Sequence, residues 1–363
     1  MEIGLQLLSS SWGERGVSDS DVYREEMQLA VRADELEYDL IGIVEHHFED
    51  YSFCPDNFVY LANLASKTKN SRLLTAAVII PWNDPLRVAE KAALLDELSD
   101  GRLILGLGRG LSKREYDQFG INMEESRERF DEAVPMILEA LETGVMSNHS
   151  GKFYVQPEAR IRPAPSRSFK GRVNQVAMSS DSVIEAAVHG AKVMQFSYKP
   201  MAVHKEEIDT YAAEYRRLHK TSPPVPMFID LTVCDRDSGR AEANSRKYIS
   251  DYFLSVVHHY EMLGDHFSNA KGYEEYGEAA SAMREAGMES LLESYLDSQI
   301  TGTPQQMLDR LEQRRAVVGD FDMLFCFRFA GNEMEVAMRS LETVASDVIP
   351  EMRRMGMAET RVA

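Results

Sequence analysis

The chain has 363 residues, a length within the roughly 200 to 400 of (β/α)8 barrels that carry insertions. Its formal net charge of −19 would repel nucleic acid and anionic membranes, so neither is an expected partner. No apolar segment approaches the roughly 20 residues that cross a bilayer, and no secretory signal is visible. Three cysteines, Cys54, Cys234 and Cys326, form no Cys-x-x-Cys pair. We therefore expect a cytoplasmic protein without a disulfide framework.

Short apolar segments alternate with amphipathic helical segments along the whole chain. Eight segments have the apolar or β-branched composition of strands that are buried on both faces. They are residues 3–8, 40–45, 73–80, 103–107, 173–178, 193–197, 225–233 and 322–327. Eight strands alternating with helices indicate the α/β class, and a closed (β/α)8 barrel, the TIM barrel, is the simplest arrangement. A doubly wound open sheet is the alternative, because periodicity alone does not distinguish the two.

Two stretches are longer than ordinary loops, residues 144–172 and 264–300. In a barrel, long insertions after strands often carry or cover the active site. The alternative is a surface excursion, which the composition supports equally well. No flexible linker or repeat divides the chain, so we expect one domain over residues 1–363 with these two insertions.

Two histidines, His46 and His47, follow the second predicted strand, where a barrel places its chemistry. Side chains alternate along a strand, so the two rings cannot both point at one ligand. One can face the barrel mouth while the other packs. The alternative is a pair of buried or solvent-exposed structural histidines. We expect no metal, because no third ligand at a diagnostic spacing is visible.

Possible anion-binding groups follow the fourth and fifth predicted strands. Gly106-Leu107-Gly108-Arg109-Gly110 lacks the third glycine of a dinucleotide fingerprint, but its glycines permit close backbone approach and the Arg109 guanidinium suits a phosphate. A tight turn with a solvated arginine is the alternative. Ser179 and Ser182 stand where a helix begins and either cap it or help hold an anion. Asp181 between them disfavours an anion unless it points away.

In their order and spacing, these residues and several other segments resemble the luciferase-like flavin monooxygenases, and bacterial luciferase in particular. The resemblance covers nearly the whole chain. It includes Val44-Glu45-His46-His47-Phe48, Thr75-Ala76-Ala77-Val78-Ile79-Ile80-Pro81, Gly108-Arg109-Gly110-Leu111, Ser126-Arg127, Val176-Ala177, Lys271-Gly272-Tyr273, Gly302-Thr303-Pro304 and Ser346-Asp347-Val348-Ile349-Pro350. No single segment is specific, but together they are.

The resemblance implies a two-component enzyme that takes reduced FMN from a separate flavin reductase. Dioxygen then forms a C4a-peroxyflavin, which oxygenates a small organic substrate. It also implies residue roles. His46 would be the catalytic histidine beside the flavin, with His47 as its neighbour, and Ala76–Ala77 would form a non-proline cis peptide under the isoalloxazine ring. The phosphate would be bound by Arg109, Arg127, Ser179 and Ser182. Met178 would make a backbone contact with the cofactor, and the segment near Tyr273 would be a mobile active-site loop.

One departure from luciferase is Gly108, which replaces a reactive cysteine and is expected to enlarge the pocket. A deazaflavin-dependent hydride-transfer enzyme of the same fold is one alternative function. A non-catalytic flavin-binding subunit is another, although the retained His46 and arginines speak against it. The resemblance also implies a homodimer, and the helix predicted at residues 84–98 agrees with this because it has apolar residues on more than one face, namely Leu86, Leu94 and Leu98 beside Val88.

Overall fold

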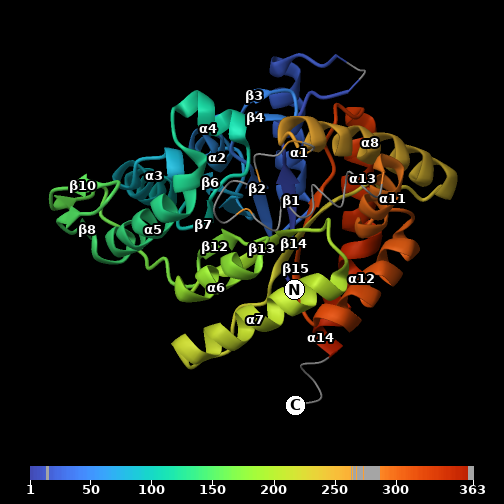
Figure 1. The fold of residues 1–363 in the computed structure, drawn as a ribbon. Coiled ribbons are helices and arrows are strands. Elements are labelled where there is room, and N and C mark those ends of the chain that lie inside the picture. Colours follow the sequence, from blue (N-terminus) through green and yellow to red (C-terminus); the bar gives the residue numbers. More distant parts are fainter. Residues whose placement is uncertain (14–15, 263, 265–266, 268–272, 274–286, 359–363) are drawn as a thin grey trace.

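The computed structural model describes residues 1–13, 16–262, 264, 267, 273 and 287–358. Eight parallel strands form a closed barrel at the centre of the molecule (Figure 1). They are β1 (Ile3–Leu7), β2 (Leu40–Ile43), β5 (Arg72–Thr75), β7 (Leu103–Gly108), β12 (Val173–Val176), β13 (Lys192–Phe196), β14 (Met227–Leu231) and β15 (Asp322–Cys326). Strand β12 pairs with both β13 and β7, which closes the sheet. The predicted TIM barrel is confirmed, and the open sheet is wrong.

After two of the barrel strands, the chain forms further short strands that the sequence did not predict. The segment 73–80 divides into β5 and a short β6 (Val78–Ile79) that pairs with β7, with the cis peptide Ala76–Ala77 between them. The second strand ends at Ile43, and the two histidines lie instead in β3 (His46–Glu49). Strand β3 pairs antiparallel with β4 (Ser52–Cys54), so a separate hairpin above the barrel presents the histidines (Figure 1).

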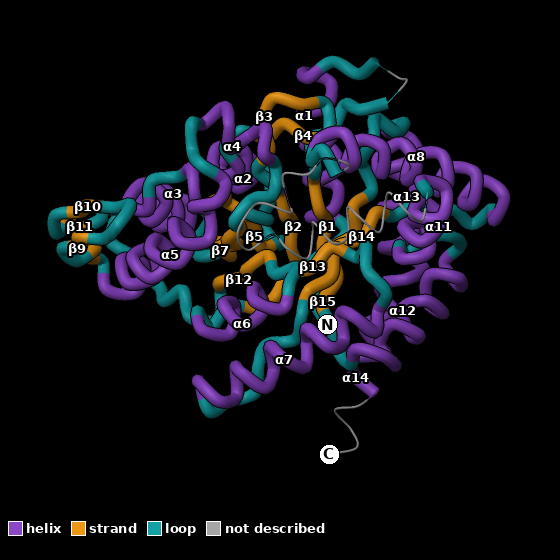
Figure 2. Tube along the Cα trace, viewed as in Figure 1, coloured by secondary structure: helices purple, strands orange, loops and turns teal. Residues whose placement is uncertain are grey.

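Helices surround the barrel strands, as Figure 2 shows. They are α1 (Asp19–Glu35), α2 (Asn57–Ala65), α3 (Pro85–Leu98), α4 (Lys113–Phe119), α5 (Ser126–Thr143), α6 (Ser180–Val188), α7 (Met201–His219), α8 (Ser238–His259), α11 (Met288–Ser298), α12 (Pro304–Val318), α13 (Met334–Thr343) and α14 (Ile349–Ala358). Local sequence sets several helix starts: Asp84 caps α3 through the Arg87 amide, and Thr303 forms a capping box with Gln306 at α12.

The barrel strands are buried on both faces. On the outside, side chains such as Ile3, Ile41 and Leu103 pack in one large apolar cluster with the helices. Inside the barrel, a second cluster fills the centre with Leu40, Leu74, Ala76, Ala77, Ile104, Met194, Met227, Ile229 and Leu324. Burying each large apolar side chain contributes roughly 1.5–3 kcal/mol, so the barrel is a packed core and the chemistry is left to its mouth.

The insertion at 144–172 connects α5 to β12, so it follows a helix and not a strand. It contains the short strands β8 (Val145–Met146), β9 (His149–Ser150), β10 (Val155–Gln156) and β11 (Ala159–Arg160). Glu132 of α5 accepts hydrogen bonds from the backbone amides of Phe153 and Tyr154, and Glu142 accepts one from Phe169. The stretch folds against α5, and the surface-excursion alternative is the correct one.

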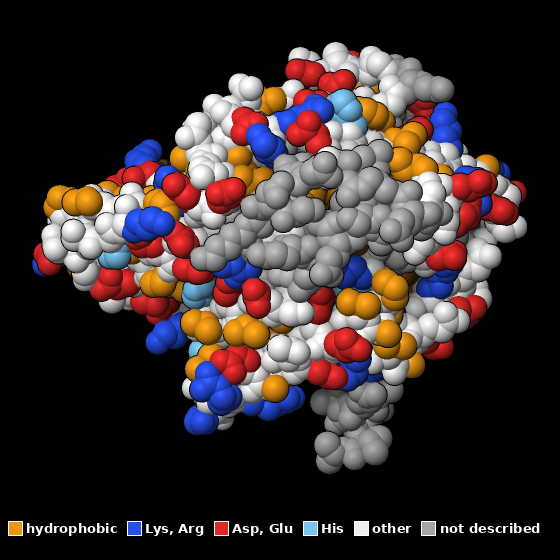
Figure 3. All heavy atoms as spheres, viewed as in Figure 1, with side chains coloured by type: hydrophobic (Ala, Val, Ile, Leu, Met, Phe, Trp, Pro, Cys, Tyr) orange, Lys and Arg blue, Asp and Glu red, His pale blue; other side chains and the backbone are white. Residues whose placement is uncertain are grey.

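The insertion at 264–300 lies mostly outside the described residues, as does most of the predicted mobile loop. Its described part contains α11, which packs on α8 and pairs Glu293 with Arg246 at 2.7 Å. This stretch belongs to the long connection between β14 and α12, at the C-terminal end of the barrel. Acidic and basic side chains are interspersed over the described part of the face in Figure 3.

Within the described part of the chain, no helix combines the length and apolar character needed to span a membrane.

Candidate active site

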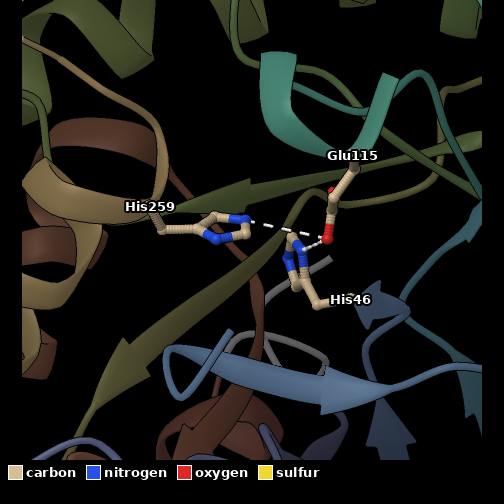
Figure 4. A group of neighbouring side chains, drawn as sticks. All are labelled: His46, Glu115 and His259. Carbon is tan, nitrogen blue, oxygen red and sulfur yellow. Dashed lines mark hydrogen bonds and ion pairs between the residues drawn. The ribbon is translucent and has the colours of Figure 1, made fainter. Parts of the chain in front are cut away.

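His46 lies at the mouth of the barrel, in contact with groups from two other segments. Its Nδ1 is 3.0 Å from Oε1 of Glu115 in α4, and its Nε2 is 3.3 Å from the hydroxyl of Tyr260. The same Glu115 oxygen accepts a hydrogen bond of 2.7 Å from the backbone amide of His47. The Glu115 side chain is 1 % exposed and that of His46 is 14 % exposed. The carboxylate therefore fixes the hairpin and the His46 ring together (Figure 4).

His47 points to the opposite side of the hairpin, as the alternation of side chains along a strand predicts. Its ring packs edge-on against Phe119 at 4.8 Å and against Trp82 at 6.0 Å. Its Nε2 is 3.4 Å from Glu45, whose carboxylate also accepts a hydrogen bond from the Trp82 indole. His47 is buried in this aromatic cluster, so the structure separates the two histidines into one at the mouth and one that packs.

His259, the last residue of α8, completes the group drawn in Figure 4. Its ring is edge-on to His46 at 5.3 Å and stacked on Tyr51 at 4.5 Å, and its Nε2 is 3.7 Å from Glu115. Burial, helped by the nearby His46, lowers the pKa of His259 to about 2, so this ring is neutral at physiological pH. His46 and Glu115 are joined by an ordinary hydrogen bond, whereas neither ring nitrogen of His259 has a hydrogen-bond partner among the described residues. The ligand atoms of His46, Glu115 and His259 lie close enough together to hold a metal ion. The expectation of no metal stays a prediction.

The predicted phosphate residues come together beside the N-terminus of α6. Arg127 of α5 forms an ion pair with Glu185 and lies 3.7 Å from Asp181. Burial, together with the nearby charge of Arg109, lowers the pKa of Arg127, which shows that the two guanidinium groups are neighbours. Such a pair favours an anion, which would have to replace the carboxylates at Arg127.

Ser179 and Ser182 form a capping box at the start of α6, with each side chain bound to the backbone of the other residue. Both side chains are buried. The capping alternative is therefore observed, and the α6 N-terminus beside the arginines keeps the site suited to an anion. The carbonyl of Met178, just before the cap, accepts a hydrogen bond of 2.5 Å from Lys199.

Ala76 and Ala77 lie in the apolar cluster inside the barrel and are nearly inaccessible. Gly108 is beside them, and a Cβ atom there would lie 3.0 Å from Ile79 Cδ1 and 3.1 Å from Ala77 Cβ. The expectation that Gly108 enlarges the pocket stays a prediction. Ile79 and Ala77 would have to shift by a few tenths of an ångström to make room for a side chain at this position.

Two residues of the site, Glu115 and His259, were missed by reasoning from the sequence. Glu115 lies in the first turn of the helix that follows the Gly108-Arg109-Gly110 segment, so its position after a barrel strand was an available signal. His259 gave no such signal, since it ends a helix 213 positions from His46 in the printed numbering. The closure of the barrel brings both to His46.

The closed (β/α)8 barrel thus carries a histidine–carboxylate pair and two arginines at its C-terminal mouth, an arrangement typical of an enzyme of this fold. The sequence model of the luciferase-like monooxygenase family matches residues 1–320. The chain belongs to this family.

Relatives with assigned activities match over almost the full chain. The alkanal monooxygenase alpha chain of Photobacterium leiognathi is 24% identical, over 94% of this chain and 97% of its own. The oxygenase component of the flavin-dependent trigonelline monooxygenase of Acinetobacter baylyi is 24% identical, over 92% of this chain and 91% of its own.

Solved structures share the fold. Monooxygenase RslO1 from Streptomyces bottropensis superimposes with a TM-score of 0.80 at 24% identity, covering 97% of this chain and 100% of its own. The oxygenating constituent of 3,6-diketocamphane monooxygenase from Pseudomonas putida, solved with FMN, gives 0.74 at 17% identity, covering 96% and 98%. An F420-dependent secondary alcohol dehydrogenase gives 0.70 at 15% identity, covering 94% and 97%.

Proposed function

We propose that this chain is the oxygenase component of a two-component, FMN-dependent monooxygenase of the cytoplasm. It would take reduced FMN from a separate flavin reductase and use dioxygen to oxygenate a small organic molecule. The observation that carries the proposal is the pairing of His46 with Glu115 at the barrel mouth, in the same chain as the neighbouring Arg109 and Arg127. An acid–base group and an anion site are what a flavin phosphate and an oxygen reaction require.

The residues present fit FMN. Arg109 and Arg127, with the N-terminus of α6 at Ser179, would hold the phosphate. Ala76, Ala77 and the backbone of Met178 would contact the rest of the cofactor. Reduced FMN, when bound, supplies the electrons that activate dioxygen.

His46 would give or take a proton at Nε2, because its Nδ1 is held by Glu115. The buried aromatic rings of Tyr51 and His259 around it would exclude water, which competes with oxygen transfer.

The first expected result concerns the division of labour between two proteins. The purified chain alone should oxidise no NADH or NADPH, because it lacks a dinucleotide fingerprint. Adding FMN and a flavin reductase should start oxygen consumption beyond that of the reductase alone. An oxygen electrode and the absorbance of NADPH follow both quantities. Robust NADPH turnover by the chain alone would refute the two-component function.

A deazaflavin would be bound instead of FMN if the chain were a hydride-transfer enzyme. The fold of the F420-dependent dehydrogenase keeps this the second candidate. Parallel absorbance titrations with reduced FMN and with a reduced deazaflavin decide between them. Tighter binding of the deazaflavin would overturn our assignment of the cofactor.

We also expect a homodimer built on α2 and α3. These two helices pack on each other and leave Val59, Leu94 and Leu98 with exposed fractions of 67%, 48% and 61%. Apolar side chains clustered on a surface are typical of an interface. Light scattering at micromolar concentration should give the mass of a dimer, and the double variant Leu94→Lys/Leu98→Glu should give a monomer.

The matched control for the interface is Val155→Lys, which places a charge on an apolar residue that is 79% exposed on β10. This variant should remain dimeric. A wild-type monomer would contradict the prediction outright.

A further inference from the structure

A line of hydrogen-bonded side chains extends from His46 into the protein. The hydroxyl of Tyr252 donates to that of Tyr51 at 3.0 Å, and the hydroxyls of Tyr51 and Tyr260 are 3.2 Å apart. The Tyr260 hydroxyl is 3.3 Å from His46 Nε2, and His46 Nδ1 is 3.0 Å from Glu115. Five side chains, from α8 and its C-cap, the β3–β4 hairpin and α4, thus form one continuous line of hydrogen bonds.

The direction of every bond in this chain follows from its two ends. An ionised carboxylate can only accept, so Glu115 Oε1 accepts from the backbone amide of His47 and from His46 Nδ1, which leaves Nε2 of the neutral ring as an acceptor. Nε2 then takes the Tyr260 proton. From the other end, Tyr51 accepts the Tyr252 proton and must direct its own to Tyr260. All donors point towards Glu115.

The surroundings of the tyrosines allow them to pass a proton on but not to act as bases. Burial raises the pKa of Tyr51 and the pKa of Tyr252 above the ordinary tyrosine value. Both hydroxyls therefore keep a proton at physiological pH and can only pass one on. His259, stacked on Tyr51, stays neutral and does not compete for it.

Tyr252 lines a small cavity of about 20 Å³ at the far end of this line of hydrogen bonds. That volume holds one water molecule, or the hydroxyl group of a larger molecule. Phe196 and Ile229 also line the cavity, and both pack in the barrel cluster that contains Ala76 and Ala77. The proposed function places the flavin against Ala76 and Ala77 of this same cluster.

We infer that this cavity receives an acidic hydroxyl group of the substrate, a phenol or an enol, and that the chain from Tyr252 to His46 removes its proton. The inference rests on the proposed function and names its substrate class. Tyr252 is the terminal member, so its oxygen is the one that accepts a hydrogen bond from such a hydroxyl.

The proton transfer balances along the chain. The substrate O–H bond breaks as its proton joins the Tyr252 oxygen; Tyr252 passes its proton to Tyr51, Tyr51 to Tyr260, and Tyr260 to His46 Nε2. His46 becomes an imidazolium ion, and the substrate an oxyanion that accepts a hydrogen bond from Tyr252. Glu115 is the positioning residue, because its negative charge stabilises that imidazolium.

The test measures the ionisation of a bound phenol and needs neither flavin nor turnover. Purified full-length chain is equilibrated with 4-nitrophenol at a pH where the free compound is half ionised, and the absorption band of the 4-nitrophenolate ion is recorded. We expect the bound compound to show an ionised-to-neutral ratio about tenfold above that of the free compound, which corresponds to about 1.4 kcal/mol. No binding, or binding of the neutral phenol, would overturn the inference.

Substitutions along the hydrogen-bonded relay test whether its residues transfer a proton or only support the structure. Glu115→Gln keeps the size and the accepting oxygen but removes the charge, so the excess ionisation should disappear, and Glu115→Asp should restore part of it. Tyr252→Phe should abolish it by breaking the far end. Tyr295→Phe is the matched control. Tyr295 lines the same cavity but is not a member of the hydrogen-bonded relay, so removing its hydroxyl should leave the ionised fraction of the bound phenol unchanged.

Two further controls keep the outcomes distinct. 4-Nitroanisole, which has no hydroxyl proton, should bind equally to the wild type and to Tyr252→Phe. If Glu115→Gln is unfolded by circular dichroism, Tyr252→Phe alone decides, and full ionisation in that variant refutes the relay. Absence of flavin-dependent oxygen consumption would refute the proposed function but would leave the 4-nitrophenol result standing, and the reverse holds as well.

Discussion

His46→Ala should lower product formation roughly 100-fold or more, the lower range of acid–base contributions. Its imidazole is the group at the barrel mouth that is both held in one orientation by Glu115 and able to exchange a proton at Nε2. Binding of reduced FMN should stay nearly normal, because the proposed phosphate site at Arg109 and Arg127 does not include the His46 ring. More of the consumed oxygen should leave as hydrogen peroxide, which a peroxidase-coupled assay measures beside the product.

The control is His47→Ala, which removes the neighbouring ring on the other side of the hairpin. His47 packs against Phe119 and Trp82, so its loss should lower the thermal unfolding temperature more than the coupling of oxygen to product. If His46→Ala forms product at the wild-type rate with equal coupling, His46 is structural and the proposed mechanism is wrong.

Arg109→Ala should weaken the binding of reduced FMN by roughly 1.5–3 kcal/mol, the usual magnitude of a charge-assisted hydrogen bond. That corresponds to an increase in Kd of roughly 10- to 150-fold. The guanidinium lies 4.2 Å from the Tyr273 ring and close enough to Arg127 to lower its pKa, so a phosphate there would meet two positive charges. Anaerobic fluorescence titration with reduced FMN gives the Kd.

Arg129→Ala is the matched control for this variant. This variant also removes one positive charge, in this case from α5. Arg129 pairs with Glu125 and lies over the Phe153 ring, away from the α6 N-terminus. Its Kd for reduced FMN should stay within about twofold of the wild type, since a surface ion pair contributes little. Equal affinities of Arg109→Ala and the wild type would remove Arg109 from the phosphate site.

The order of the elements could be read from the sequence because each depends on nearby residues. A strand buried on both faces needs a continuous apolar segment, and each of the eight predicted segments overlaps a barrel strand. Helix starts depend on residues three positions apart, as at Asp84 and Thr303, so their caps were predictable as well. The positions of His46, Arg109 and Ser179 after strands followed from the same local pattern.

Which groups meet those residues depended on the closure of the barrel. Glu115 and Tyr260 contact His46 across 69 and 214 positions of sequence, and no spacing in the chain predicts either contact. Likewise, Ile79 lies beside Gly108 because β6 pairs in parallel with β7. A single residue type at a strand end is a local property, so the sequence determined it. The hydrogen-bond partners of that residue, and the direction in which its protons point, come from segments that only the tertiary structure brings together.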